Sequence, residues 1–188
     1  MAEKARFRIL GFAGSLRKDS CNKALLRAAL ELVPEGVKME TFDLEGIPLF
    51  NQDLEGNPPQ KVTEFKAKIR GADALLIATP EYNYSIPGVL KNAIDWASRP
   101  YGDNAFQDKP VAFMGASIGM LGTARAQYHL RQCCVFLQMH PVIDTEVMVP
   151  FVSDKVDSQG RVTDEKTKEK IKELIESLII WTKRLKLK

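Results

Sequence analysis

The sequence predicts a three-layer α/β protein with a five-stranded parallel sheet of order 2-1-3-4-5 and helices on both faces. Three observations support this prediction. Five stretches with strand character alternate with five stretches whose apolar residues have helical spacing. Two of the strand stretches are almost wholly apolar, which is typical of strands covered on both faces. The 188 residues are 45% hydrophobic and 27% charged, which fits a single domain spanning residues 1–188.

The predicted strands differ in how deeply they are expected to lie. Residues 8–13 are mostly apolar and form the first strand, whereas residues 37–41 alternate apolar with polar side chains, as an edge strand does. Residues 72–79 and 110–116 are the near-continuous apolar runs and belong in the middle of the sheet. Residues 142–149 have the weakest pattern and are predicted as the fifth strand.

Each strand is followed by a stretch in which apolar residues recur every three or four positions. Pro87 suits the first position of the third helix, with Ser85 as its N-cap. A long polar loop with several Gly and Pro residues, 43–59, precedes the second helix. The predicted helices cover residues 23–33, 60–70, 87–98, 123–137 and 165–185.

Composition and charge exclude several classes of function. The net charge is only +3 and the Lys and Arg residues are spread along the chain, which argues against a nucleic-acid-binding protein. No apolar run approaches the roughly 20 residues of a membrane span, and residues 1–6 lack the apolar core of a signal peptide. Three cysteines without a Cys-x-x-Cys pair, and two isolated histidines, argue against a metal site. We therefore expect a cytoplasmic protein that does not bind a membrane.

The first distinctive motif follows the first strand. In a sheet of this order, ligands bind where the carboxyl ends of strands one and three diverge. Gly14 allows a tight turn there, and Ser15, Ser20 and Asn22 offer side-chain donors at the start of a helix whose dipole favours an anion. Arg17 adds a charge-assisted contact. The motif is neither a Walker loop nor Gly-x-Gly-x-x-Gly, and the alternative is an ordinary turn with Ser20 as a helix cap.

The second motif follows the third strand, on the opposite side of the same switch point. Pro80 fixes the exit of the chain, after which Glu81, Tyr82 and Asn83 present backbone groups and an aromatic ring, as a flat heterocycle with donors and acceptors requires. The alternative is that Tyr82 anchors the loop and Glu81 is a solvated carboxylate. Three residues after the fourth strand are expected to close the other side of the ring: Ser117, Ile118 and Gly119.

The two motifs together resemble a known family. Gly14-Ser15-Leu16-Arg17-x-x-Ser20-x-Asn22 and the stretch from Pro80 to Trp96 are similar to the NAD(P)H-dependent FMN reductases, in particular the branch with bacterial chromate and quinone reductases. The resemblance implies a flavodoxin-like fold, bound FMN, NADPH or NADH as co-substrate, and a homodimer or homotetramer. It also implies the following cofactor-binding residues: Ser15, Leu16, Arg17, Ser20, Cys21, Asn22, Pro80, Glu81, Tyr82, Asn83, Ser117, Ile118 and Gly119.

The expected reaction is a two-step redox cycle. A hydride passes from NAD(P)H to FMN, and the electrons then pass to a small acceptor such as a quinone, free flavin, chromate, or an azo or nitro compound. No protein residue is expected to be the essential acid or base, although Glu81 and Tyr82 are candidates for tuning the ring. The alternatives are a flavodoxin-type electron carrier that depends on a protein partner, and a flavin or nucleotide sensor without turnover.

Overall fold

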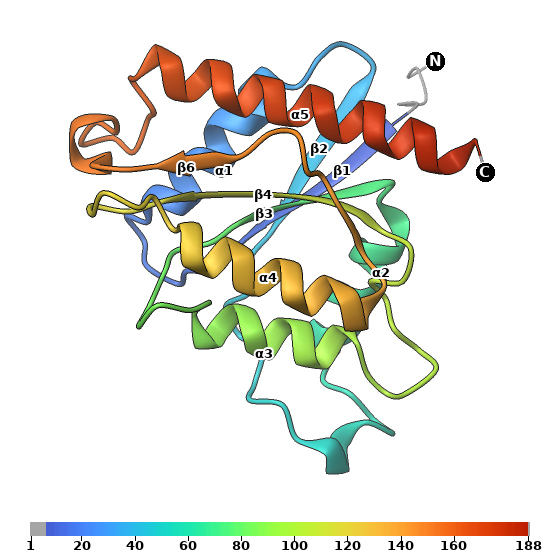
Figure 1. The fold of residues 1–188 in the computed structure, drawn as a ribbon. Helices are drawn as coiled ribbons and strands as arrows, with labels where there is room; N and C mark the ends of the chain where they lie inside the picture. The colour runs from blue at the N-terminus through green and yellow to red at the C-terminus, as the bar shows by residue number, and fades with distance from the viewer. Residues whose placement is uncertain (1–6, 188) are drawn as a thin grey trace.

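A computed structural model describes residues 7–187; the N-terminal segment 1–6 and residue 188 lie outside the described residues. The described chain forms three layers, with a central sheet between two layers of helices (Figure 1). The strands are β1 (Phe7–Ala13), β2 (Val37–Phe42), β3 (Ala74–Ala78), β4 (Pro110–Ala116), β5 (His140–Pro141) and β6 (Val147–Val149). All the paired strands are parallel and the order is β2-β1-β3-β4-β5, with β6 also pairing with β4. The predicted sheet order is therefore confirmed.

The fifth strand differs from the prediction, which was a continuous strand over residues 142–149. In this part of the chain, two short strands, β5 and β6, pair with β4, and the residues between them are not in a strand. Side chains of α4 (Ala124–Leu137) bind backbone carbonyl groups on both sides of the break, because Arg131 Nη1 donates to Val142 O at 2.7 Å and Gln127 Nε2 donates to Val147 O at 3.0 Å. Side-chain bonds of this kind are invisible to a local hydrophobic pattern.

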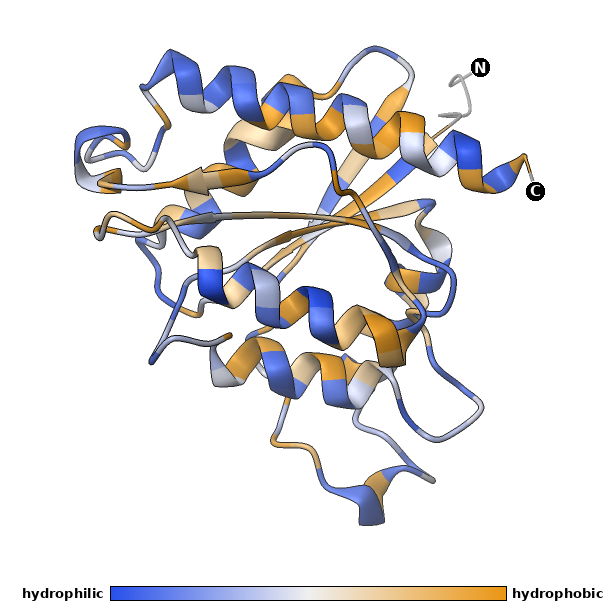
Figure 2. Ribbon diagram, viewed as in Figure 1, coloured by the Kyte–Doolittle hydropathy of each residue, from blue (hydrophilic) through white to orange (hydrophobic). Residues whose placement is uncertain are grey.

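The helices cover the two faces of the sheet. Their bounds are α1 (Cys21–Leu32), α2 (Gln60–Gly71), α3 (Gly88–Ala97), α4 (Ala124–Leu137) and α5 (Glu165–Lys186). Buried side chains of α1 and α5 form one hydrophobic cluster with the sheet, and those of α2, α3 and α4 form a second cluster on the opposite face. Figure 2 shows the result: the outward side of α5 is mostly hydrophilic and the strands between the layers are mostly hydrophobic.

Aromatic rings fill the second cluster. Phe65 of α2 meets Phe12 of β1 edge to face, with ring centroids 5.2 Å apart, and meets Phe106 at 6.5 Å. Edge-to-face pairs of this kind add stability beyond the area that they bury. This packing fixes α2 against the centre of the sheet and leaves the carboxyl ends of the strands free for a site.

The start of α3 also differs from the prediction. Pro87 is the N-cap, so the helix begins one residue later, at Gly88, and no side chain caps it. Ser85, the predicted cap, instead places its Oγ 2.9 Å from Nδ1 of His129 on α4. The proline ring presets the backbone at this position, so the helix starts without a side-chain cap.

The long loop 43–59 lies against α3. Trp96 Nε1 and Asn92 Nδ2 both donate to Pro48 O at 2.8 Å, and Phe50 N–H donates to Asn92 Oδ1 at 2.7 Å. These bonds give the loop a defined path even though it contains only one short 3₁₀ helix, Gln52–Leu54. Within residues 7–187, no helix has both the length and the apolar character that a membrane crossing requires.

Candidate functional site

The carboxyl ends of β1 and β3 meet at the point where the strand order reverses. Ala13 pairs with Ala78 in the sheet, and the next residue, Gly14, donates its N–H to Ala78 O at 2.8 Å. Gly14 does not have a positive φ angle. A Cβ at this position would instead lie 3.0 Å from Pro87 Cγ and 3.1 Å from Leu90 Cβ, so a larger residue would crowd these side chains at the start of α3. The turn is as tight as the sequence suggested, but for a packing reason.

A cleft of about 270 Å³ opens at this switch point, in front of the amino end of α1. Ala116 and Val152 complete its wall. Leu16 is not among the lining residues and is exposed, while Asn83 and Gly119 line the adjoining hollow described below. The predicted site residues that line the cleft are Ser15, Arg17, Ser20, Cys21, Asn22, Pro80, Glu81, Tyr82, Ser117 and Ile118.

The loop before α1 has the groups that a phosphate needs. Ser15 is buried and its Oγ accepts the N–H of Arg17 at 3.3 Å, while Ser20 Oγ accepts the N–H of Lys23 at 3.3 Å. Ser20 is therefore the N-cap of α1, as the alternative interpretation held. Both hydroxyl groups keep a hydrogen to donate. The first N–H groups of α1 have no acceptor within the helix, and the first two residues of the helix, Cys21 and Asn22, line the cleft.

Asn22 is used differently from the prediction that its side chain donates to a ligand. The residue is only 3% exposed, its Nδ2 donates to Ala116 O at 3.1 Å, and its Oδ1 accepts Ala116 N–H at 2.9 Å. The amide thus acts as a clasp between α1 and the last residue of β4. These two bonds hold the orientation of the side chain, so its first role is structural, and the backbone N–H of Asn22 lies in the first turn of α1, where it has no acceptor within the helix.

The side chain of Glu81 is bound by the amino end of α4, so it is not a solvated carboxylate. Its side chain is 8% exposed and forms an ion pair with Arg125, whose guanidinium pKa it raises through a hydrogen bond. The other carboxylate oxygen accepts the backbone N–H groups of Arg125 at 3.0 Å and Ala126 at 3.3 Å. Because Thr123, the N-cap residue of α4, makes no capping bond with its own side chain, Glu81 caps that helix from a distant part of the sequence.

The third wall of the cleft is the segment after β4. Ser117 N–H donates to Val149 O at 3.0 Å, Val152 N–H donates to Ser117 O at 3.1 Å, and Phe151 N–H donates to Gly119 O at 3.3 Å. These bonds hold the segment against residues 149–152, which sequence reasoning did not connect with the site. No local pattern marks the connection, since it arises only when β6 lies beside β4.

An adjoining hollow lies on the other side of the Glu81 and Ser117 backbone. It is lined in part by Asn83, Tyr84 and Arg125, with the exposed apolar side chain of Met120 at its edge. Its volume is about 540 Å³. The two hollows share Glu81 and Ser117, so a ligand in either one lies against the same pair of loops.

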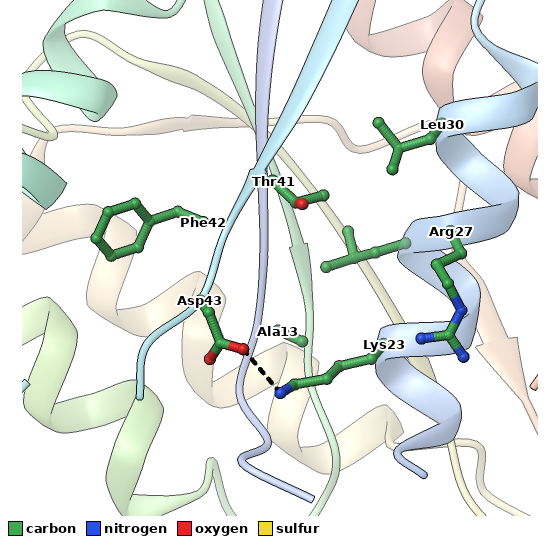
Figure 3. Close-up of a pocket in the computed structure, with 8 residues that line it drawn as sticks. Ala13, Lys23, Arg27, Leu30, Thr41, Phe42 and Asp43 are labelled. Carbon is green, nitrogen blue, oxygen red and sulfur yellow. Dashed lines mark hydrogen bonds and ion pairs between the residues drawn. The ribbon is translucent and has the colours of Figure 1, made fainter. Parts of the chain in front are cut away.

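A separate hollow lies between α1 and the end of β2 (Figure 3). Its volume is about 150 Å³, and Lys23 Nζ closes it by donating to Asp43 Oδ2 at 3.0 Å. Partial burial by itself would raise the pKa of Asp43, but hydrogen bonds from Glu45 N–H and Lys23 outweigh it and lower the pKa. Thr41 lies on the α1 side, whereas Phe42 points to the opposite face of the sheet. This hollow is smaller than the cleft and lies on the β2 side of β1, whereas the cleft lies between the loops that follow β1, β3 and β4.

The residues at the switch point match the chemistry of FMN. Hydroxyl groups, helix N–H groups and Arg17 suit the phosphate, and the turn with Tyr82, which is 48% exposed, suits the flat ring. The sheet order defines a flavodoxin-like fold, and the cleft at its switch point has the residue types of a flavoprotein of that class.

Comparison with known proteins narrows the class to a family. The sequence profile of the NADPH-dependent FMN reductases matches residues 7–154. The chain is 52% identical over 181 residues to an NAD(P)H-dependent FMN reductase of Pseudomonas aeruginosa, covering 95% of this chain and 97% of that protein. It is 41% identical over 170 residues to a 2-hydroxy-1,4-benzoquinone reductase of Burkholderia, covering 90% and 93%. The chain belongs to the NADPH-dependent FMN reductase family.

A solved structure supports the same assignment. The flavoenzyme FerB of Paracoccus denitrificans, an NAD(P)H:acceptor oxidoreductase, superposes with a TM-score of 0.86 at 34% identity, covering 95% of this chain and 98% of that one. The protein is therefore an FMN-dependent oxidoreductase that takes its electrons from NAD(P)H. The prediction of the family, the cofactors and the enzyme class is confirmed.

Proposed function

We propose that the protein reduces small acceptors, with quinones as the main class and free flavin, chromate, azo and nitro compounds as further candidates, in the cytoplasm. The observation on which the proposal depends is the cleft at the carboxyl ends of β1, β3 and β4, in which both distinctive motifs meet. The quinone class is supported by relatives named for that activity. The cysteines of the described chain are all free, which is consistent with a reducing compartment.

The phosphate end of the cofactor is assigned to the loop before α1. Ser15, Ser20 and the first N–H groups of α1 donate to the phosphate oxygens, and Arg17 supplies the positive charge. Cys21 and Asn22 contribute through their backbone N–H groups. These contacts hold the cofactor in one orientation relative to the sheet.

The ring of the cofactor is assigned to the two loops that follow β3 and β4. Pro80 to Asn83 present backbone donors and acceptors to its polar edge, and Ser117 to Gly119 close the other side. When bound, FMN supplies the hydride chemistry, and the protein positions the nicotinamide donor and then the acceptor against the exposed face of the ring. The assigned residues orient the reactants and exclude water, so no side chain has to act as an essential acid or base.

An anaerobic titration tests this function. The purified protein, reconstituted with FMN, is expected to show a flavin band near ~450 nm that bleaches on addition of NADPH and returns on addition of a benzoquinone. A flavin band that NADPH leaves unchanged would contradict the proposal. A flavodoxin-type carrier would bind FMN but would oxidise NADPH only after a reductase partner was added, so steady-state turnover with NADPH and quinone alone separates the two alternatives.

We also propose that the protein works as a homodimer or homotetramer. The outer side of α4 and the loop that follows it expose large apolar side chains, namely Tyr128, Val135, Phe136 and Ile143. An exposed apolar patch of this kind is typical of a subunit interface. Light scattering on a size-exclusion column is expected to give twice or four times the mass of the chain, and Phe136→Glu is expected to lower that mass. A monomeric wild-type protein at micromolar concentration would contradict this proposal.

A further inference from the structure

The turn between β3 and α3 has a costly backbone conformation. Tyr82 N–H donates to Ser85 O at 3.0 Å and Ser85 N–H donates to Tyr82 O at 2.9 Å, which closes a two-residue turn. The two central residues have positive φ angles, +51° at Asn83 and +67° at Tyr84. Turns of this type favour the pair Asn-Gly, because a bulky residue is strained in this region. Tyr84 therefore needs compensating contacts, which its ring can supply.

The ring of Tyr84 stacks on Arg125. The guanidinium carbon of Arg125 lies 3.5 Å from the ring centroid, and the same guanidinium pairs with the buried carboxylate of Glu81. Glu81 in turn holds the amino end of α4 through the N–H groups of Arg125 and Ala126. Arg125 thus connects the first half of the loop, at Glu81, with the strained tip of the turn, at Tyr84.

A second contact fixes the far end of the turn to the same helix. Ser85 Oγ lies 2.9 Å from Nδ1 of His129, which is four residues after Arg125 and hence on the same side of α4. The turn is therefore held at both ends by one rigid helix. Because Tyr82 is bonded to Ser85 through both of its backbone groups, its position in the cleft depends on these contacts.

We propose that Arg125 is a positioning residue for the flavin ring: it acts through Glu81 and Tyr84 to hold the Tyr82–Ser85 turn in the shape that receives the cofactor. This inference depends on the proposed assignment of the ring to the loop after β3. The proposal explains why a tyrosine occupies this strained position. A glycine would form the turn more easily, but it could not stack on Arg125.

Arg125→Ala tests the proposal, with Arg131→Ala as the matched control. Arg131 lies on the same helix and uses its guanidinium to bind Val142 O at 2.7 Å, away from the turn. We expect the FMN dissociation constant, measured by quenching of flavin fluorescence, to rise about 10-fold in Arg125→Ala and to change by less than about 2-fold in Arg131→Ala. Equal effects of the two variants would overturn the proposal.

Tyr84→Gly separates positioning from general stability. This variant creates the favoured Asn-Gly pair, so the melting temperature of the cofactor-free protein should be maintained or raised, whereas FMN affinity should fall and the visible circular dichroism of bound FMN should change. Tyr84→Phe, which keeps the ring, should restore both. Unchanged affinity in Tyr84→Gly would overturn the proposal.

A double variant tests whether the two residues act together. Arg125→Ala combined with Tyr84→Gly should weaken FMN binding no more than the stronger single change does, because both changes break the same stack. Multiplied effects would show independent roles and overturn the coupling. If the wild-type protein itself bound no FMN, the proposed function would fail, and that result would be distinct from every outcome of the variants.

Discussion

At the scale of single residues, Asn22 shows how one amide joins distant parts of the chain. Its side chain satisfies both backbone groups of Ala116, the last residue of β4, within the buried interior. When a buried backbone group loses its hydrogen-bond partner, the folded state is destabilised by the full desolvation free energy of that group. The amide therefore fixes the amino end of α1 relative to β4, and so fixes two walls of the cleft.

Replacement of this amide should destabilise the fold. We expect Asn22→Ala to lower the free energy of unfolding by about 3 kcal/mol, since two buried groups of Ala116 lose their partners. Urea unfolding measures this change. Asn57→Ala, at an exposed position, is the control and should stay within about 0.5 kcal/mol of the wild type. A similar loss in both variants would show that the clasp has no special role.

Arg17 makes a different contribution, because it is exposed at the rim of the cleft. We expect Arg17→Ala to raise the FMN dissociation constant by about 10-fold and to make it less sensitive to salt, since a charge-assisted contact to the phosphate is lost. Fluorescence titration at two ionic strengths measures both effects. Lys18→Ala removes an equal charge from the next residue, which does not line the cleft, and should have little effect. Equal effects would mean that only the overall charge matters.

At the scale of the elements, side-chain caps decide where three of the helices begin. Ser20 caps α1 from the adjacent position in the sequence, while α4 depends on Glu81 from the loop after β3. Asp164 caps α5: its carboxylate accepts the N–H of Thr167 at 2.9 Å and the hydroxyl of Thr167 at 2.6 Å. Local caps could be predicted from the sequence, whereas the remote cap of α4 could not.

The cap of α5 gives a prediction about stability. Asp164→Ala should lower the free energy of unfolding by about 1 kcal/mol at neutral pH, because the first turn of α5 loses its acceptor. Asp164→Asn, which keeps an acceptor, should lose only a few tenths of that amount. Thermal unfolding followed by circular dichroism measures both variants. An Asn variant as unstable as the Ala variant would show that charge, and not capping geometry, carries the effect.

At the scale of the whole molecule, bound carboxylates make stability depend on pH. Hydrogen bonding to Lys66 holds the pKa of Asp103 below its ordinary value of 3.8, with Arg70 adding to the effect. Hydrogen bonding to Thr167 likewise lowers the pKa of Asp164. The aspartates with a lowered pKa are Asp43, Asp73, Asp103, Asp157 and Asp164.

These shifts predict sensitivity to acid. Because each folded-state pKa lies below the unfolded value of 3.8, the folded protein binds fewer protons near that pH, and the stability present above it is lost as pH falls through the folded-state pKa. Urea unfolding between pH 7 and pH 3 should show a decline below about pH 4. Asp103→Asn should make the decline shallower, and a flat profile would contradict the assignment.

Much of the fold was accessible from local patterns. The apolar runs at β3 and β4 predicted central strands, and the order of the sheet followed from the alternation of strands with helices. The prediction of a strand over residues 142–149 was right for 147–149, which form β6, and wrong for 142–146, where Arg131 binds the carbonyl group of Val142. The start of α3 was misplaced by one residue, because Pro87 caps a helix that has no side-chain acceptor.

The candidate site was predicted in part. Residue types and spacing indicated which loops meet at the switch point, and ten of the thirteen assigned residues line the cleft. The roles inside the loops could not be predicted, since Glu81 reaches α4 and Asn22 reaches β4 only in the folded chain. The positive φ angle of Tyr84 could not be predicted from the sequence either, because bulky residues such as tyrosine rarely adopt the left-handed conformation.

The sequence by itself determined the α/β class, the order of the sheet, the two loops and, through their resemblance to a family, the cofactor, because periodicity and motif spacing are local properties of the chain. The tertiary structure decided which side chains remain available for a ligand and which are consumed in holding the walls of the cleft. The physical reason is that a hydrogen bond or an ion pair depends on distance in space, and residues 44 to 94 positions apart become neighbours only when the sheet has formed.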